Sequence, residues 1–175
     1  MTREKIIKNA FEWLQAGRLT YYREGYYDML SVLKCFVDTG AEYVNYQDIE
    51  NYFDYDIKEE KEFDYSKLNN DELIKHIAKF TSSIWQVHPF GEGNTRTTAV
   101  FIEKYLNSLG FNVNNDMFKD KSLYFRNALV RSNYGNIPKG IYPTFDYLVM
   151  FFENLLQGKN NELKNKELYV KNLFD

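Results

Sequence analysis

The sequence predicts an all-α domain, and three observations carry that prediction. Apolar residues recur at helical spacing along most of the 175-residue chain. The chain holds only three prolines, so few positions interrupt a helix. A single short run has the aromatic and β-branched character of a strand, namely Glu42, Tyr43, Val44, Asn45 and Tyr46. The expected architecture is therefore a helical bundle with a small β excursion.

The first half of the chain is expected to hold three helices around that run. Thr2 caps a helix that ends near Gly17, and a second helix covers residues 24–38. After the strand candidate, we expect a short helix over residues 48–53. A charged, solvated connector then leads to Tyr65.

In the second half, Asn69 stands three residues before Glu72, which predicts a capped helix ending at Val87. The inward residues of this helix are expected to be Leu73, Ile77, Phe80 and Ile84. Three further helices are expected: 94–109 closed by Gly110, 122–133 capped by Ser122, and one opened by Pro143 and Thr144 and stopped by Gly158.

The length of the chain predicts one domain, which we divide into an N-terminal helical region (1–40), a core (41–158) that holds the remaining helices, and a polar, weakly helical tail (159–175). The net charge of −3 gives no reason to expect nucleic-acid binding. Cys35 has no internal partner, which is typical of a reducing cytosol. We find no signal peptide and no apolar run of the ~20 residues that span a membrane. A cytoplasmic protein without nucleic-acid or membrane partners is expected.

The segment His88–Arg96, HPFGEGNTR, carries most of the usable chemistry and lies between two apolar stretches. This layout predicts helix, polar loop, helix. Gly91 and Gly93 allow sharp turns and close approach of a ligand. The backbone N–H groups of Gly93, Asn94 and Thr95 would then open onto a helix N-terminus, which suits phosphate.

The side chains of the segment fit the same chemistry. Asn94 adds an amide donor, and Arg96 adds a guanidinium that matches phosphate oxygens. Glu92 is useful beside phosphates if it holds Mg²⁺, and His88 can act as a general base. Together they indicate phosphoryl or nucleotidyl transfer to a hydroxyl. The alternative is an ordinary helix–helix turn in which His88 is structural.

Other motifs do not fit. Gly91-x-Gly93 lacks the third glycine of a dinucleotide fingerprint, and no P-loop follows. Two histidines twelve residues apart and one remote cysteine make no zinc site. We expect His76 to be structural, and Phe151 and Phe152 to lie in the core or an interface.

The segment resembles the signature of Fic domain proteins, H-x-F-x-[DE]-G-N-x-R-x-x-R. Six specified positions match: His88, Phe90, Glu92, Gly93, Asn94 and Arg96. Thr95 replaces a usual glycine and Ala99 replaces the final arginine. The stretch from about Asn45 to Gly158 is also similar to the helical core of this family.

The resemblance implies AMPylation, the transfer of AMP from ATP to a Ser, Thr or Tyr hydroxyl of a target protein. It implies that His88 deprotonates the hydroxyl and that Glu92 holds Mg²⁺. Gly93 and Asn94 then line the anion hole and Arg96 steadies the outer phosphates, while Phe90 anchors the loop.

Further elements follow from the resemblance. The family uses a β-hairpin flap to align the target by strand pairing, and residues 42–46 are the candidate. Asn133 and Tyr134 are candidates for the adenine pocket. Thr20, Glu24 and Gly25 fit the inhibitory pattern [ST]-x-x-x-E-[GN]. The alternative for these three is a helix start, with Thr20 as cap and Glu24 in the first turn.

Two other functions stay open. Thr95 and Ala99 favour a degenerate Fic fold that binds nucleotide or protein without catalysis. A related enzyme could transfer a different group, as in the phosphorylating Doc branch, although Doc-like loops carry Ala where this chain has Gly93. The target protein is unknown, and homo-oligomerisation is left open.

Overall fold

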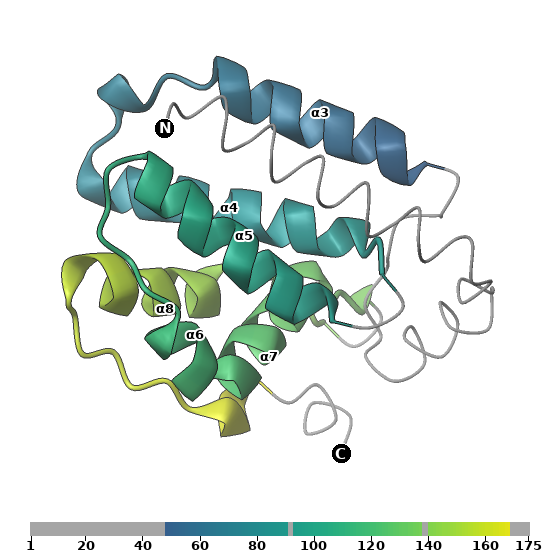
Figure 1. The fold of residues 1–175 in the computed structure, drawn as a ribbon. Helices are drawn as coiled ribbons and strands as arrows, with labels where there is room; N and C mark the ends of the chain where they lie inside the picture. Colours follow the sequence, from purple (N-terminus) through teal and green to yellow (C-terminus); the bar gives the residue numbers. More distant parts are fainter. Residues whose placement is uncertain (1–47, 91–92, 138–139, 169–175) are drawn as a thin grey trace.

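The structure is a computed structural model that describes residues 48–90, 93–137 and 140–168 (Figure 1). Its α-helices are α3 (Ile49–Glu62), α4 (Asn70–Val87), α5 (Asn94–Ser108), α6 (Asp116–Asp120), α7 (Ser122–Asn133) and α8 (Asp146–Gln157). Two 3₁₀ turns are η1 (Tyr65–Lys67) and η3 (Asn165–Glu167). The described ranges contain no strand, only an isolated antiparallel bridge between Asn136 and Ile141. The all-α expectation is confirmed there. The first two expected helices and the flap candidate, residues 42–46, lie outside the described residues.

Helix α4 is the centre of the fold, since α3, α5, α7 and α8 all pack against it. Figure 1 shows α3 and α5 on either side of it. Of the expected inward residues, Ile77, Phe80 and Ile84 are buried, whereas Leu73 is partly buried against the same core. This packing fixes the C-terminal end of α4, where the motif begins.

The start of α4 is a capping box, as the sequence predicts. Asn69 Oδ1 accepts hydrogen bonds from the backbone N–H groups of Asp71 and Glu72, both at 3.0 Å. Glu72 Oε2 accepts in return from the N–H of Asn69 at 3.0 Å. The local sequence alone therefore sets where this helix begins.

The expected solvated connector before Tyr65 is wrong. Helix α3 continues to Glu62, because no Gly or Pro interrupts it and its buried face repeats at Ile49, Phe53, Ile57 and Glu60. Glu60 is 3% exposed and lies next to His76, whose Nε2 is 2.7 Å from Glu60 Oε2.

Two tyrosines complete the surroundings of Glu60. The hydroxyls of Tyr65 and Tyr105 both donate to Glu60 Oε1. The ring of His76 stacks on Phe63 with centroids 3.6 Å apart. His76 is thus structural, as expected, and the cluster ties α3 to α4 and α5.

Aromatic side chains fill the space between α6, α7 and α8. Phe125, Phe151 and Phe152 are fully buried, which confirms that the last two belong to the core. Phe118 on α6, a helix that the sequence did not predict, meets Phe125 edge-on with centroids 5.1 Å apart.

Some helix ends differ from the expected ones. Ser122 is the first residue of α7 and does not cap it, since Lys121 precedes the helix without a side-chain bond. Helix α8 begins at Asp146, later than expected, because Thr144 Oγ1 accepts from the Asp146 N–H at 3.2 Å. The predicted stops hold: Gly110 and Gly158 have φ of +95° and +66°.

The segment after α8 packs on the core through Leu168, which is 1% exposed. Asn127 on α7 donates to Asn165 Oδ1 at 3.1 Å and anchors η3. No helix in the described ranges is long and apolar enough to cross a membrane.

Candidate active site

His88 ends α4 in a left-handed conformation, with φ 49° and ψ 54°, and its N–H donates to Trp85 O at 3.1 Å. It is the one non-glycine residue with positive φ in the described part of the chain. Such a conformation costs about 1–3 kcal/mol and persists only where the surroundings enforce it. The turn directs the chain into the loop that joins α4 to α5.

The imidazole of His88 is neutral at physiological pH. Burial lowers the pKa of His88 to about 4, against a smaller raising effect of its backbone hydrogen bond to Trp85. The guanidinium of Arg126 on α7 lowers the pKa further by charge repulsion. A neutral imidazole can accept a proton, so His88 meets the first requirement for a general base.

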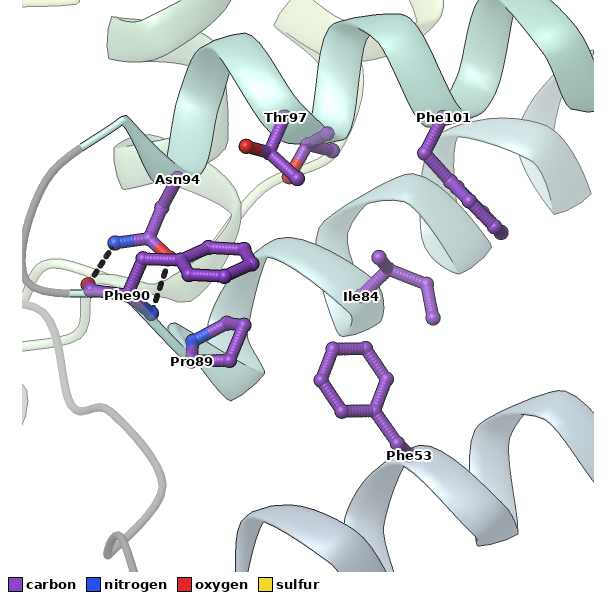
Figure 2. A pocket seen from close by; sticks show the side chains of 8 residues that line it. Phe53, Ile84, Pro89, Phe90, Asn94, Thr97 and Phe101 are labelled. Atoms are coloured by element: carbon purple, nitrogen blue, oxygen red, sulfur yellow. Dashed lines mark hydrogen bonds between the residues drawn. The ribbon is translucent and has the colours of Figure 1, made fainter. Parts of the chain in front are cut away.

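Asn94 and Phe90 close the loop on itself. Asn94 Oδ1 accepts from the Phe90 N–H at 3.0 Å, and Asn94 Nδ2 donates to the Phe90 carbonyl (Figure 2). Both residues are buried, at 5% and 9% exposed. Phe90 therefore faces inward as expected. The Asn94 amide, expected to be a phosphate donor, holds the loop backbone instead.

The N-terminus of α5 carries positive charge from two sources. Gly93 precedes the helix with φ +80°, no side chain caps it, and its first turn holds no acid. Arg96 folds back over this end: a Cβ built on Gly93 would lie 3.6 Å from Arg96 Nη2. A guanidinium and a helix N-terminus repel each other, so this arrangement suits an anion that contacts both.

Thr95 lies in the first turn of α5 with a helical backbone. Its Oγ1 accepts a hydrogen bond from Trp85 Nε1 at 3.1 Å. The ring of Trp85 also meets the ring of His88 edge-on, with centroids 5.1 Å apart. The sequence analysis did not identify Trp85 as a site residue. The signal that could have found it is its spacing, three residues before His88 on the same helix.

A small pocket lies behind the loop, between α3, the end of α4 and the start of α5 (Figure 2). It is lined by Phe53, Ile84, Pro89, Phe90, Asn94, Thr97, Thr98 and Phe101. Neither His88 nor Arg96 lines it. Of the expected site residues, the pocket therefore includes Asn94 but neither the candidate base nor the guanidinium.

The sequence was compared with known protein families. The model of the Fic/DOC family matches residues 19–106, which is half of the chain. The chain belongs to the Fic/DOC family. No curated protein and no solved structure matches it.

Within the Fic/DOC motif, the two departures have different structural consequences. Thr95 fits without backbone strain because α5 has already begun at Asn94. Ala99 is 7% exposed and belongs to the apolar core. No cation projects from position 99, and Arg96 is the one arginine of α5.

Several expected site residues lie outside the described ranges: Gly91, Glu92, the flap candidate and the inhibitory candidates Thr20, Glu24 and Gly25.

Within the described ranges, no three His, Cys, Asp or Glu residues gather as a metal site. Mg²⁺ beside phosphates needs only one or two carboxylates, so a single loop carboxylate such as Glu92 fits its donor preference.

The adenine-pocket candidates lie at the end of α7, against α4. Asn133 Nδ2 donates to Ser82 Oγ and to the Leu129 carbonyl, both at 2.9 Å. Tyr134 is 5% exposed. These contacts pack α7 on α4, and a role in adenine binding stays a prediction.

Proposed function

We propose that this chain is a protein adenylyltransferase that moves AMP from ATP to a Ser, Thr or Tyr hydroxyl of a target protein. One observation carries the proposal: a neutral His88 ends α4 while Arg96 folds over Gly93 at the N-terminus of α5. A base and an anion site thus stand at the two ends of one loop. Family membership agrees, because Fic proteins are often AMPylators.

The reaction uses these groups in separate roles. The target hydroxyl oxygen attacks the α-phosphorus, and its proton goes to His88. The bond from the α-phosphorus to the bridging β-phosphate oxygen breaks, and pyrophosphate leaves. The N–H groups at the start of α5 and the Arg96 guanidinium stabilise the negative charge on the phosphates.

Mg²⁺ would neutralise phosphate charge when bound, and Glu92 is the residue proposed to hold it. Residues 42–46 are proposed to align the target segment by strand pairing, which reads backbone more than side chains. The partner is therefore a protein with an extended segment that carries a hydroxyl. We propose a cytoplasmic setting, in keeping with the single cysteine.

Parallel labels test the reaction. The protein is incubated with Mg²⁺, cell lysate and ATP labelled at either the α- or the γ-phosphate. We expect protein-bound label from the α position only, and none with His88→Ala. Protein-bound label from the γ-phosphate alone would show that the reaction is phosphorylation and not AMP transfer.

A second function has one observation in its favour. Ala99 is buried among apolar residues, so the loop lacks a cation that Fic enzymes place on the outer phosphate. A chain that binds MgATP but leaves no label on any protein would be a nucleotide-binding module. The same experiment decides between the two.

A further inference from the structure

Trp85 connects the two helices that carry the loop. Its Nε1–H donates to Thr95 Oγ1 at 3.1 Å across ten residues of sequence. The same ring meets the His88 imidazole edge-on, with an interplanar angle of 88°. Trp85 is 2% exposed, so the surrounding core fixes the position of its ring. One buried side chain of α4 therefore contacts both the proposed base and the first turn of α5.

The direction of this bond determines where the Thr95 proton can go. An indole nitrogen donates and never accepts, so Thr95 Oγ1 is the acceptor. The hydroxyl proton of Thr95 must then be directed away from Trp85. In the described part of the chain, no group accepts a hydrogen bond from it.

The surroundings of Thr95 indicate which acceptor it would meet. Thr95 is half-buried in the first turn of α5, where helix N–H groups have no intrahelical partner. The next residue, Arg96, folds back over the same helix end. All these groups are donors or cations, so the acceptor that completes the set is an anion.

We propose that the Thr95 hydroxyl donates to a phosphate oxygen of the bound nucleotide, and that Trp85 is the positioning residue that orients it. The inference rests on the proposed function and adds the Thr95 hydroxyl and the positioning residue Trp85 to its phosphate site. Where a glycine offers only its backbone N–H, this chain adds a side-chain donor.

Four variants separate this role from a structural one, with MgATP affinity and unfolding free energy measured in each. Thr95→Val keeps the shape and removes the hydroxyl, and we expect MgATP binding to weaken about tenfold. Thr95→Ser keeps the hydroxyl and should bind close to wild type. Trp85→Phe should weaken binding by less than Thr95→Val. Thr97→Val, in the same turn but lining the pocket, is the matched control and should bind normally.

The double variant Trp85→Phe with Thr95→Val is the decisive comparison. Thr95→Val alone removes the acceptor of the Trp85 indole N–H, which costs stability; in the Trp85→Phe background the same substitution should cost less unfolding free energy. If the pair is only structural, the MgATP affinity of the double variant should rise from that of Thr95→Val to that of Trp85→Phe. We expect the double variant to bind MgATP no more tightly than Thr95→Val.

The outcomes also separate this inference from the proposed function. Thr95→Val that binds MgATP as tightly as wild type overturns the inference alone, as does recovery of affinity in the double variant. Wild-type protein that does not bind MgATP overturns the inference and the proposed function together. AMP transfer by wild type with unchanged binding in Thr95→Val keeps the function and removes the Thr95 contact.

Discussion

The guanidinium of Arg96 lies over Gly93, so close that a Cβ on that glycine would be 3.6 Å from Arg96 Nη2. Both the guanidinium and the N-terminus of α5 are electropositive. Their proximity is unfavourable without an anion, and no acid in the first turn of α5 supplies one. The relationship therefore supports the proposed phosphate site by charge and geometry, in addition to the sequence motif.

Gly93→Ala should weaken both stability and nucleotide binding. Its φ of +80° disfavours any side chain, by about 1–2 kcal/mol for left-handed backbone. Gly158→Ala is the control: its φ is +66°, and nothing lies within 4 Å of its Cβ position. Both variants should lose similar unfolding free energy in urea, but only Gly93→Ala should lose MgATP affinity. Equal affinity in the two would show that the loop conformation does not matter.

Asn94→Ala should open the loop. The variant removes both hydrogen bonds to the buried Phe90 backbone, and we expect a loss of about 1–3 kcal/mol in unfolding free energy. Asn107 forms the same kind of clamp on Val113, at 2.9 and 2.7 Å, away from the motif. Asn107→Ala should lower stability but leave MgATP binding intact. Normal binding by Asn94→Ala would contradict the proposed role of the clamp.

AMP transfer should stay nearly constant from pH 7 down to pH 5.5. Burial lowers the pKa of His88 to about 4, so the imidazole remains neutral over this range. A histidine with an ordinary pKa of about 6.5 would be about tenfold less available at pH 5.5. Initial rates on one target peptide measure this, and a midpoint near 6.5 would show that His88 is not buried as described.

The same pKa predicts a pH dependence of stability. Because the folded pKa lies below the unfolded value of about 6.5, the unfolded state binds more protons between the two. The neutral His88 thus contributes about 3 kcal/mol above pH 6.5, relative to pH values below 4. This contribution is lost as the pH falls through that range.

Urea unfolding of wild type and His88→Ala at pH 7 and pH 4.5 isolates this effect. Asp56, whose pKa burial raises to about 6, acts in the opposite direction in both proteins and cancels in the difference. The difference between the two proteins should change toward lower wild-type stability at pH 4.5. A difference independent of pH would contradict the lowered pKa.

Arg126→Gln should raise the pKa of His88, since it removes a repelling guanidinium. An NMR titration of the His88 ring measures this without any assay of transfer. Lys121→Gln, at the start of the same helix, is the control and should leave the titration unchanged. An unchanged pKa in Arg126→Gln would place that guanidinium too far away to matter.

Local signals predicted the parts of the fold that depend on neighbouring residues. Asn69 and Glu72 bond within four residues, so the start of α4 was readable from the sequence. The end of α3 was not, because the burial of Glu60 depends on Tyr105, forty-five residues away. A run of charged residues looks solvated until such distant partners are known.

For the candidate site, too, local features were predictable and long-range contacts were not. The sequence of the loop indicated a base, an anion site and an inward Phe90. The Asn94 clamp is local, but the sequence does not say whether an amide bonds a ligand or its own loop. The Trp85–Thr95 bond depends on how α4 and α5 pack, and the effect of Arg126 on His88 depends on the position of α7.

The most direct test measures AMP transfer and MgATP binding together in wild type and His88→Ala. Transfer is followed by mass spectrometry of AMP-modified target peptides, and binding by calorimetry. Loss of the proposed general base should slow transfer at least about a hundredfold while MgATP affinity changes little, because the proposed phosphate site at Arg96 and the start of α5 stays intact. Transfer by His88→Ala at the wild-type rate would contradict the account.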